Sequence, residues 1–244
     1  MRGWIQAIFI SGGLLWLVGL LATCQVQNSV KSPYQVLRER MVREQIEARG
    51  IHDPRVLRAM RKVERHKFVP EEYRDLAYED HPLPIGEGQT ISQPYIVALM
   101  TELLELDEHD RVLEVGTGSG YQAAVLAEIC DSVYTIEIIE SLGRRAEALL
   151  KELGYTNVKV KIGDGYKGWP EHAPFDGIIV TCAPTHIPPP LQEQLAEGGR
   201  MVIPVGERFT QELVLLRKEN GKIIQREVIP VRFVPMLKEG GGEW

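Results

Sequence analysis

The stretch from residue 111 to residue 120 constrains the fold of this chain more than any other. It reads RVLEVGTGSG, and its apolar run at 112–115 fits a buried parallel strand. Three glycines follow at once, and residues 121–130 read as a helix. A strand, a glycine turn and a helix in this order begin a βαβ unit. The glycines permit a tight turn and let a ligand approach the backbone, beside free N–H groups at the helix start. The stretch therefore predicts a site for a nucleotide-like ligand.

The spacing of these glycines narrows the kind of ligand. Gly116, Gly118 and Gly120 give G-x-G-x-G, whereas dinucleotide-binding enzymes use G-x-G-x-x-G. Glu114 stands two residues before the first glycine. A glycine-rich turn alone is also compatible with a simple tight turn, so its meaning depends on the residues that follow it.

Two acids follow later strands of the same pattern. Glu137 ends the apolar strand predicted at 132–137, close to the roughly 20-residue separation at which an acid accepts two hydrogen bonds from a ribose diol. Asp164, followed by Gly165, comes after the strand predicted at 158–162 and suits a contact to an adenine amino group. The alternative for Glu137 is a solvated acid at the end of a strand, and the alternative for Asp164 is a simple turn. The distance of Glu137 from the glycine turn favours the binding role.

Composition limits the function classes. The chain has 244 residues, of which 44% are hydrophobic and 25% are charged, so it suits one α/β domain. A net charge of −6 without a run of five like charges argues against a nucleic-acid-binding surface. Neither the cysteines nor the acids and histidines have metal-ligand spacing, and we expect Cys130 and Cys182 to be small buried residues.

The N-terminal segment differs from the rest of the chain. Residues 4–23 are almost entirely apolar, which predicts a signal peptide or membrane anchor over 1–24, followed by a polar linker at 25–33. Thr23 before Cys24 departs from a lipoprotein cleavage site. The charges around the span favour a domain outside the membrane or tethered to it, and a misassigned start codon is the alternative.

Two helices and a loop are predicted before the glycine turn. Residues 34–48 have helical periodicity, and Asp53 can cap a second helix that starts at Pro54. Residues 81–93 contain two prolines and two glycines and predict a loop or turns. Within this loop, Ser92 could cap the next helix, predicted at 95–104, or its hydroxyl could face a ligand. The local sequence favours the cap.

The remaining elements complete an α/β pattern. Strands are predicted at 175–181 and 200–204, a short helix at 188–195 that ends at two glycines, and a hairpin around Asn220-Gly221. The fold class is therefore α/β and Rossmann-like, with a mostly parallel sheet flanked by helices and an antiparallel C-terminal hairpin. We expect the domain to span 34–237, with a helical N-terminal extension and a loose tail at 238–244.

The glycine turn, Glu137 and Asp164 together resemble the binding site of class I S-adenosylmethionine-dependent methyltransferases. Further segments narrow the resemblance to the protein-L-isoaspartate O-methyltransferases: QTISQP at 89–94, EVGTGSGY at 114–121, GDG at 163–165, FD at 175–176 and GRMVIPVG at 199–206. The T-I-S-x-P element marks that family among methyltransferases, and the resemblance extends from about residue 41 to residue 237. This resemblance favours a Ser92 hydroxyl that faces a ligand over the helix cap that the local sequence favours.

The resemblance implies methyl transfer from S-adenosylmethionine to the free carboxylate of an L-isoaspartyl residue in a damaged protein or peptide. The ester then forms a succinimide that opens partly to normal aspartate. On this interpretation Ser92 is the catalytic residue, and the substrate-binding residues are Thr90, Ile91, Val234 and Pro235. The cofactor-binding residues are Glu114, Gly116, Thr117, Gly118, Gly120, Glu137, Asp164 and Gly165.

Two other functions stay open from the sequence alone. One is a methyltransferase of the same fold with a different acceptor, and the other is a non-catalytic cofactor-binding protein. The resemblance implies a cytoplasmic monomer, whereas the apolar segment at 4–23 indicates a membrane-anchored or exported, periplasmic protein.

Overall fold

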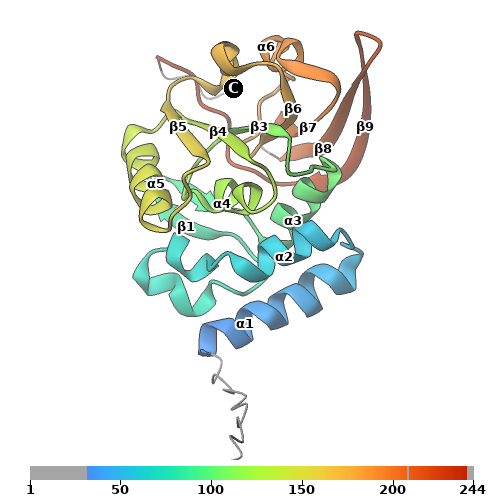
Figure 1. Ribbon diagram of the computed structural model, residues 1–244. Coiled ribbons are helices and arrows are strands. Elements are labelled where there is room, and N and C mark those ends of the chain that lie inside the picture. Colours follow the sequence, from blue (N-terminus) through green and yellow to red (C-terminus); the bar gives the residue numbers. More distant parts are fainter. Residues whose placement is uncertain (1–31, 208, 241–244) are drawn as a thin grey trace, which may run out of the picture. The chain divides into compact units, whose positions relative to one another are not determined.

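A computed structural model gives the fold of residues 32–207 and 209–240 (Figure 1). The predicted signal peptide or anchor at 1–24 lies outside these described residues, as does most of the predicted linker. Residues 32–207 and 209–240 contain no helix with the length and apolarity needed to cross a lipid bilayer.

A seven-stranded sheet in the order β5-β4-β3-β6-β7-β8-β9 forms the centre of the fold (Figure 1). Its strands are β3 (Arg111–Val115), β4 (Ser132–Glu137), β5 (Val158–Ile162), β6 (Phe175–Val180), β7 (Leu195–Glu207), β8 (Thr210–Glu219) and β9 (Lys222–Val231). The first five are parallel, and β8 and β9 continue the sheet in antiparallel pairs. The chain runs outward from β3 to β5 and then crosses to β6. The switch in direction lies between β3 and β6, where α/β sheets bind their ligands. The predicted fold class is confirmed.

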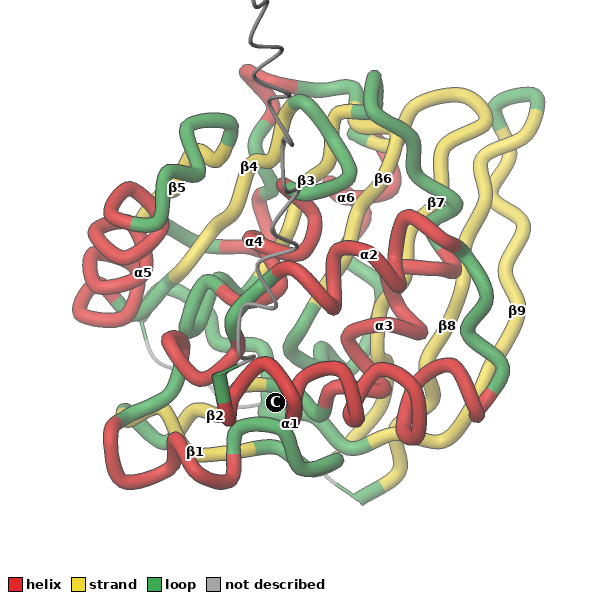
Figure 2. Tube along the Cα trace, turned by 60° about the horizontal axis from the view of Figure 1, so that its bottom comes forward, coloured by secondary structure: helices red, strands yellow, loops and turns green. Residues whose placement is uncertain are grey.

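Helices and the C-terminal segment cover the two faces of the sheet. The helices are α1 (Pro33–Met41), α2 (Pro54–Lys62), α3 (Pro94–Leu103), α4 (Tyr121–Ala127), α5 (Glu140–Glu152) and α6 (Pro189–Glu193). Successive residues of β3 show the alternation: Val112 packs with the cluster that includes α2 to α5, whereas Leu113 packs with Leu191 of α6. Figure 2 shows α2 and α3 lying across the face of the sheet to which Val112 belongs.

The two N-terminal helices begin within one residue of the predicted positions. Asp53 caps α2, since its Oδ1 accepts a hydrogen bond from the backbone N–H of Arg55 at 2.7 Å. The predicted helix at 34–48 starts one residue earlier, at Pro33. After Met41 it continues as a π-helical turn (Val42–Ile46) and a 3₁₀ turn (Glu47–Arg49), and it ends at Gly50, whose φ is 96°.

The predicted loop at 81–93 contains a β-hairpin. Strands β1 (Leu83–Gly86) and β2 (Gln89–Ile91) pair antiparallel. Glu87 and Gly88 form the turn, with φ values of 54° and 70°. Strands this short, interrupted by Pro84, gave no visible period in the sequence, so the prediction of a loop or turns missed both strands.

The two glycines predicted to end a helix at 198–199 lie within β7 instead. α6 ends at Glu193, and β7 begins two residues later. A Cβ on Gly199 would lie 2.9 Å from the backbone oxygen of Asp176, so glycine permits a close approach between β7 and β6. The pairing of these strands shifts register next to it, between Phe175 and Gly177.

The C-terminal hairpin is confirmed. Asn220 and Gly221 join β8 to β9 with φ values of 51° and 72°, the left-handed pair that a two-residue type I′ turn requires. The carboxylate of Glu197 accepts a hydrogen bond from the N–H of Gly221 at 3.0 Å and another from that of Asn220.

Candidate active site

One pocket opens at the carboxyl ends of β3, β4 and β6. It has a volume of about 750 Å³, counting solvent at its mouth. Segments far apart in the sequence form its wall: residues 89–92 of the first hairpin, 114–119 of the glycine turn, 136–139 after β4, 181–182 after β6 and 234–237 near the C-terminus, with Val97, Tyr121, Gln122 and Gly165. A pocket at this edge of the sheet is the expected place for a ligand.

The glycine turn is fixed to both neighbouring strands. The N–H groups of Gly116 and Thr117 both donate to the carbonyl oxygen of Ile136 in β4, at 2.9 and 3.2 Å. Gly116 has φ 102°, and a Cβ there would lie 2.4 Å from Oγ1 of Thr181. Only glycine fits this position, because both the backbone angle and the space exclude a side chain.

Not every residue of the glycine motif faces the pocket. Gly120 does not line it: a Cβ there would lie 3.2–3.4 Å from side-chain atoms of Leu150 and Ala146, so this glycine lets α4 pack on α5. Thr117 lines the pocket, but its Oγ1 lies 2.6 Å from Oγ1 of Thr135, and the residue is 3% exposed.

Glu137 connects the end of β4 to the glycine turn. Its Oε2 accepts a hydrogen bond from the N–H of Gly118 at 2.8 Å, and its Oε1 accepts one from the N–H of Ile139 at 2.9 Å. Burial raises the pKa of this carboxyl above its usual value, while the backbone donors act in the opposite direction. The acid lies in the pocket wall, where its free lone pairs can accept further hydrogen bonds.

Glu114 is the most unusual residue of the pocket. It is fully buried, and neither carboxylate oxygen has a hydrogen-bond partner within residues 32–207 and 209–240. Burial raises the pKa of its carboxyl to about 8; the Thr135 hydroxyl acts against this rise, and the nearby charge of Glu137 adds to it. A buried polar group without a partner requires an explanation.

The structure separates the predicted pair at 164–165. Gly165 lines the pocket, and a Cβ there would lie 2.3 Å from Cγ1 of Val115. Asp164 lies beside the wall and does not line it. Its Oδ1 accepts a hydrogen bond from the N–H of Tyr166 at 2.9 Å and so caps the short 3₁₀ turn Gly165–Lys167.

Ser92 lines the pocket and does not cap α3. The capping role belongs to Asp80, whose Oδ1 accepts a hydrogen bond from the N–H of Tyr95 at 3.2 Å and whose Oδ2 accepts one from the side chain of Gln93 at 2.8 Å. The cap that the local sequence favoured is therefore wrong. No protein group in the described part of the chain holds the Ser92 hydroxyl, which is half-buried in the wall with Thr90 and Ile91.

The C-terminal segment forms the remaining wall. Ala183, in the loop after β6, donates its N–H to the carbonyl oxygen of Val234 at 2.8 Å and accepts a hydrogen bond from the N–H of Met236 at 2.9 Å. Both predicted substrate residues of this segment, Val234 and Pro235, line the pocket. In the predicted tail, Lys238 lies over the ring of Tyr166 and Glu239 pairs with Lys167.

A buried amide on β8 holds the same segment. The side chain of Gln211 is 3% exposed. Its Oε1 accepts a hydrogen bond from the N–H of Phe233 at 2.7 Å, and its Nε2 donates one to the carbonyl oxygen of Phe233 at 3.2 Å. One side chain thus pairs with both backbone groups of a residue, as a neighbouring strand would. We call this contact the Gln211 clamp.

Some wall residues were not predicted from the sequence. Thr181 donates its hydroxyl to the carbonyl oxygen of Gly116 at 2.7 Å, which closes the turn against β6. Cys182 is half-buried in the pocket wall, whereas Cys130 is buried as expected. The only signal for these wall residues was their position after the fourth predicted strand, at the same sheet edge as the glycine turn.

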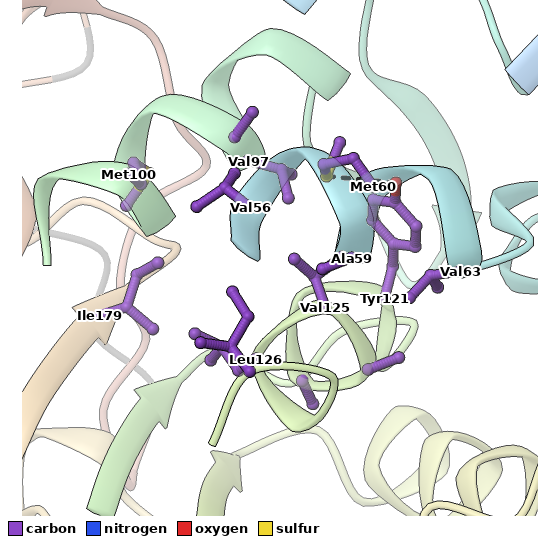
Figure 3. Close-up of a cluster of buried hydrophobic side chains, with 14 of the residues drawn as sticks. Val56, Ala59, Met60, Val63, Val97, Met100, Tyr121, Val125, Leu126 and Ile179 are labelled. Carbon is purple, nitrogen blue, oxygen red and sulfur yellow. Dashed lines mark hydrogen bonds between the residues drawn. The ribbon is translucent and has the colours of Figure 1, made fainter. Parts of the chain in front are cut away.

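Tyr121 lines the pocket and also packs the start of α4, whereas His81 and His186 lie outside the pocket. The Tyr121 ring lies against Phe68 and its hydroxyl is 3.8 Å from Sδ of Met60, so it packs the start of α4 (Figure 3). No lysine, arginine or histidine occurs among the described residues of the pocket wall, so its charged side chains are both carboxyl groups.

Comparison with known proteins shows the family to which the chain belongs. A sequence model of the protein-L-isoaspartate(D-aspartate) O-methyltransferases matches residues 36–241. The chain is 61% identical over 207 residues to protein-L-isoaspartate O-methyltransferase 1 of Nitrosospira multiformis, covering 83% of this chain and 88% of the relative. It is 56% identical over 227 residues to the Opitutus terrae enzyme, covering 91% and 97%.

Solved structures give the same result. One protein-L-isoaspartate O-methyltransferase superposes with a TM-score of 0.76 at 31% identity, covering 84% of this chain and 66% of that one. The Plasmodium falciparum protein, solved with S-adenosyl-L-homocysteine, superposes with a TM-score of 0.73 at 29% identity, covering 86% and 100%. By the extent of the sequence match and the identity to these relatives, the chain belongs to the protein-L-isoaspartate(D-aspartate) O-methyltransferase family.

Proposed function

We propose that this chain transfers a methyl group from S-adenosylmethionine to the free carboxylate of L-isoaspartyl residues in damaged proteins and peptides. The ester then closes to a succinimide, which starts repair. One observation carries the proposal: the hairpin residues 89–92 and the C-terminal residues 234–235 meet the glycine turn and Glu137 in a single pocket. The activity named for the relatives supports the same reaction.

The residues present fit S-adenosylmethionine. Gly116 and Gly118 line the pocket with backbone atoms alone, so no side chain of theirs stands between the backbone and a ligand. Glu137 has the lone pairs to accept hydrogen bonds from a ribose diol, with Gly165 and Asp164 on the adenine side. The two wall carboxyls and the absence of a cationic side chain among the described wall residues suit a positively charged ligand. When bound, S-adenosylmethionine supplies a methyl group on a positively charged sulfur.

The chemistry explains why the site needs no general base. The acceptor carboxyl has a reference pKa of about 3.9, so at neutral pH it is already the nucleophile. The protein has to align its oxygen with the methyl carbon and remove part of its water shell. We assign to Ser92 a hydrogen bond to this carboxylate, which makes it the catalytic residue. Thr90, Ile91, Val234 and Pro235 form the substrate side of the pocket.

Replacing Ser92 tests this assignment. We expect Ser92→Ala to lower kcat/KM for an isoaspartyl peptide about 10- to 100-fold, the loss typical of one hydrogen bond to a charged group. The dissociation constant of S-adenosylhomocysteine should stay within twofold of wild type, as measured by calorimetry. Thr185→Ala is the control, because this exposed hydroxyl lies in the loop after β6, at the same edge of the sheet, but does not line the pocket. Full activity of Ser92→Ala would contradict the assignment.

We also propose that residues 1–24 are a signal peptide or membrane anchor for a monomeric enzyme. The almost uninterrupted apolar composition of residues 4–23 supports this, although the family resemblance implies the cytoplasm. Cell fractionation of the full chain and of a chain starting at Gln25 tests it. The full chain should sediment with membranes or be processed, and identical soluble behaviour of both would contradict the proposal.

A further inference from the structure

The wall of the pocket holds a buried carboxyl group whose charge state the proposed function does not specify. Glu114 lies one residue before the end of β3 and is fully buried, and in the part of the chain that the structure describes neither of its oxygens has a partner in hydrogen-bonding geometry. The neutral hydroxyl of Thr135 favours the charged form of this carboxyl but supplies no positive charge. Burying a carboxylate in this way is costly unless a positive charge compensates it. No described wall residue supplies that charge.

Among the titratable side chains of the described pocket wall, Glu114 is the one whose charge can change near neutral pH. Glu137, on the neighbouring strand, already accepts hydrogen bonds from two backbone N–H groups. Burial raises the pKa values of the Cys182 thiol and of the Tyr121 hydroxyl, so both remain neutral. Arg65 lies behind the ring of Tyr121, 4.9 Å from its centre, and does not line the pocket.

We propose that the charge of Glu114 selects the cationic methyl donor over its neutral product, and that this selection strengthens as the pH rises. The inference rests on the proposed function. S-adenosylmethionine and S-adenosylhomocysteine share the adenine, the ribose and the amino-acid end, and they differ by the methyl group and one positive charge on sulfur. A charge in a desolvated wall acts on that difference across several ångströms without direct contact.

Proton balance follows from this arrangement. When the cationic donor binds, the Glu114 carboxyl releases one proton to solvent and becomes a carboxylate. After methyl transfer the sulfur is neutral, the carboxylate has lost the sulfonium as its counter-charge while the amino-acid end of the ligand is unchanged, and Glu114 takes up a proton from solvent. The neutral product therefore loses the interaction that held the donor, which favours exchange of product for donor.

Calorimetric titration of both ligands against pH tests the inference. The quantity to measure is the ratio of the dissociation constant of S-adenosylhomocysteine to that of S-adenosylmethionine. Glu137 and every contact to the shared groups affect both ligands, so their contribution to this ratio largely cancels. In wild type we expect the ratio to rise at least about fivefold between pH 6.5 and pH 8.5. In Glu114→Gln it should stay constant within twofold.

A second readout measures the proton itself. Titrations at pH 7 in two buffers of different ionisation enthalpy should show release of nearly one more proton for S-adenosylmethionine than for S-adenosylhomocysteine. Asp110→Asn is the matched control and should behave as wild type. Asp110 is another carboxyl whose pKa burial raises, but it precedes β3 at the opposite end and does not line the pocket.

The outcomes separate this inference from the proposed function. A ratio independent of pH in wild type would overturn the inference while leaving the methyltransferase assignment intact, and so would equal effects of Glu114→Gln on both ligands. If neither ligand binds, the proposed function fails as well. The wild-type measurements decide the matter even if Glu114→Gln does not fold.

Discussion

At the scale of single residues, the pocket contains positions where adding one atom or removing one charge changes stability or ligand binding. Gly116 and Gly50 both have φ near 100°, but a Cβ at Gly116 would strike Thr181, whereas nothing lies within 4 Å of one at Gly50. Comparing alanine substitutions at the two glycines therefore distinguishes the cost of backbone strain from the cost of a steric clash.

We expect Gly116→Ala to destabilise the protein by about 3 kcal/mol or more, since strain and overpacking add. Gly50→Ala should cost only about 1 kcal/mol, the strain alone. Urea unfolding measures both free energies, and binding of S-adenosylhomocysteine should be lost only in Gly116→Ala. Equal costs at the two positions would show that Thr181 moves aside.

Glu114 also makes folding depend on pH. Its pKa rises from 4.5 to about 8 on folding, so the unfolded chain gives up this proton at a lower pH than the folded chain does. Stability from this group is complete below about pH 4.5 and is lost as the pH rises towards 8.

We therefore compare the free energy of unfolding of ligand-free Glu114→Gln with that of wild type at two pH values. The variant minus wild-type difference should be larger at pH 9 than at pH 5, by up to about 4 kcal/mol. Urea unfolding at both pH values measures this difference. An unchanged difference would mean that the carboxyl finds a partner or water in the folded state.

At the scale of elements, a clamp and a hairpin bring the substrate side of the pocket to the sheet. The first hairpin is attached to α5, where Ser141 donates to Glu87 at 2.9 Å and Arg145 donates to the carbonyl oxygen of Ile85. The C-terminal segment is held by Ala183 and by the Gln211 clamp. These contacts lie outside the strand pairs of the main sheet, and for the C-terminal segment they include a parallel β-bridge between Ala183 and Pro235.

Removing the Gln211 clamp should loosen the C-terminal wall. Gln211→Ala leaves both backbone groups of Phe233 without their partner and should cost about 1–3 kcal/mol of stability. Because Val234 and Pro235 follow directly, KM for an isoaspartyl peptide should rise about fivefold or more while kcat changes less.

Steady-state kinetics with peptide concentration varied measures this split. Gln225→Ala is the control, an exposed glutamine on the neighbouring strand β9. Gln211→Glu keeps an acceptor for the Phe233 N–H but cannot donate to its carbonyl oxygen, so it should rescue KM only in part. An unchanged KM in Gln211→Ala would show that Ala183 alone positions the segment.

At the scale of the whole molecule, the sequence predicted the sheet better than the pocket. The predicted limits 132–137 and 158–162 coincide with β4 and β5, and the Asn220-Gly221 turn lies where expected, because periodicity and turn chemistry are local. The glycine turn and Glu137 were found because their spacing along one βαβ unit fixes their meeting point.

Apart from the short β1–β2 hairpin, the features that the sequence did not predict depend on contacts between distant residues. Asp80 takes over the cap of α3 and leaves Ser92 to the pocket, Gln211 reaches Phe233, and Gly199 lies against β6. Each contact forms only after the sheet has brought its partners together, so no window of neighbouring residues carries its signal.

The central claim is that the pocket methylates isoaspartate and not ordinary aspartate. The most direct measurement supplies methyl-labelled S-adenosylmethionine, the chain from Gln25 onward, and two peptides that differ only in an L-isoaspartyl or a normal aspartyl residue. We predict base-labile label in the isoaspartyl peptide alone. Equal label in both peptides, or binding of the cofactor without transfer to either, would contradict the claim and indicate another methyl acceptor.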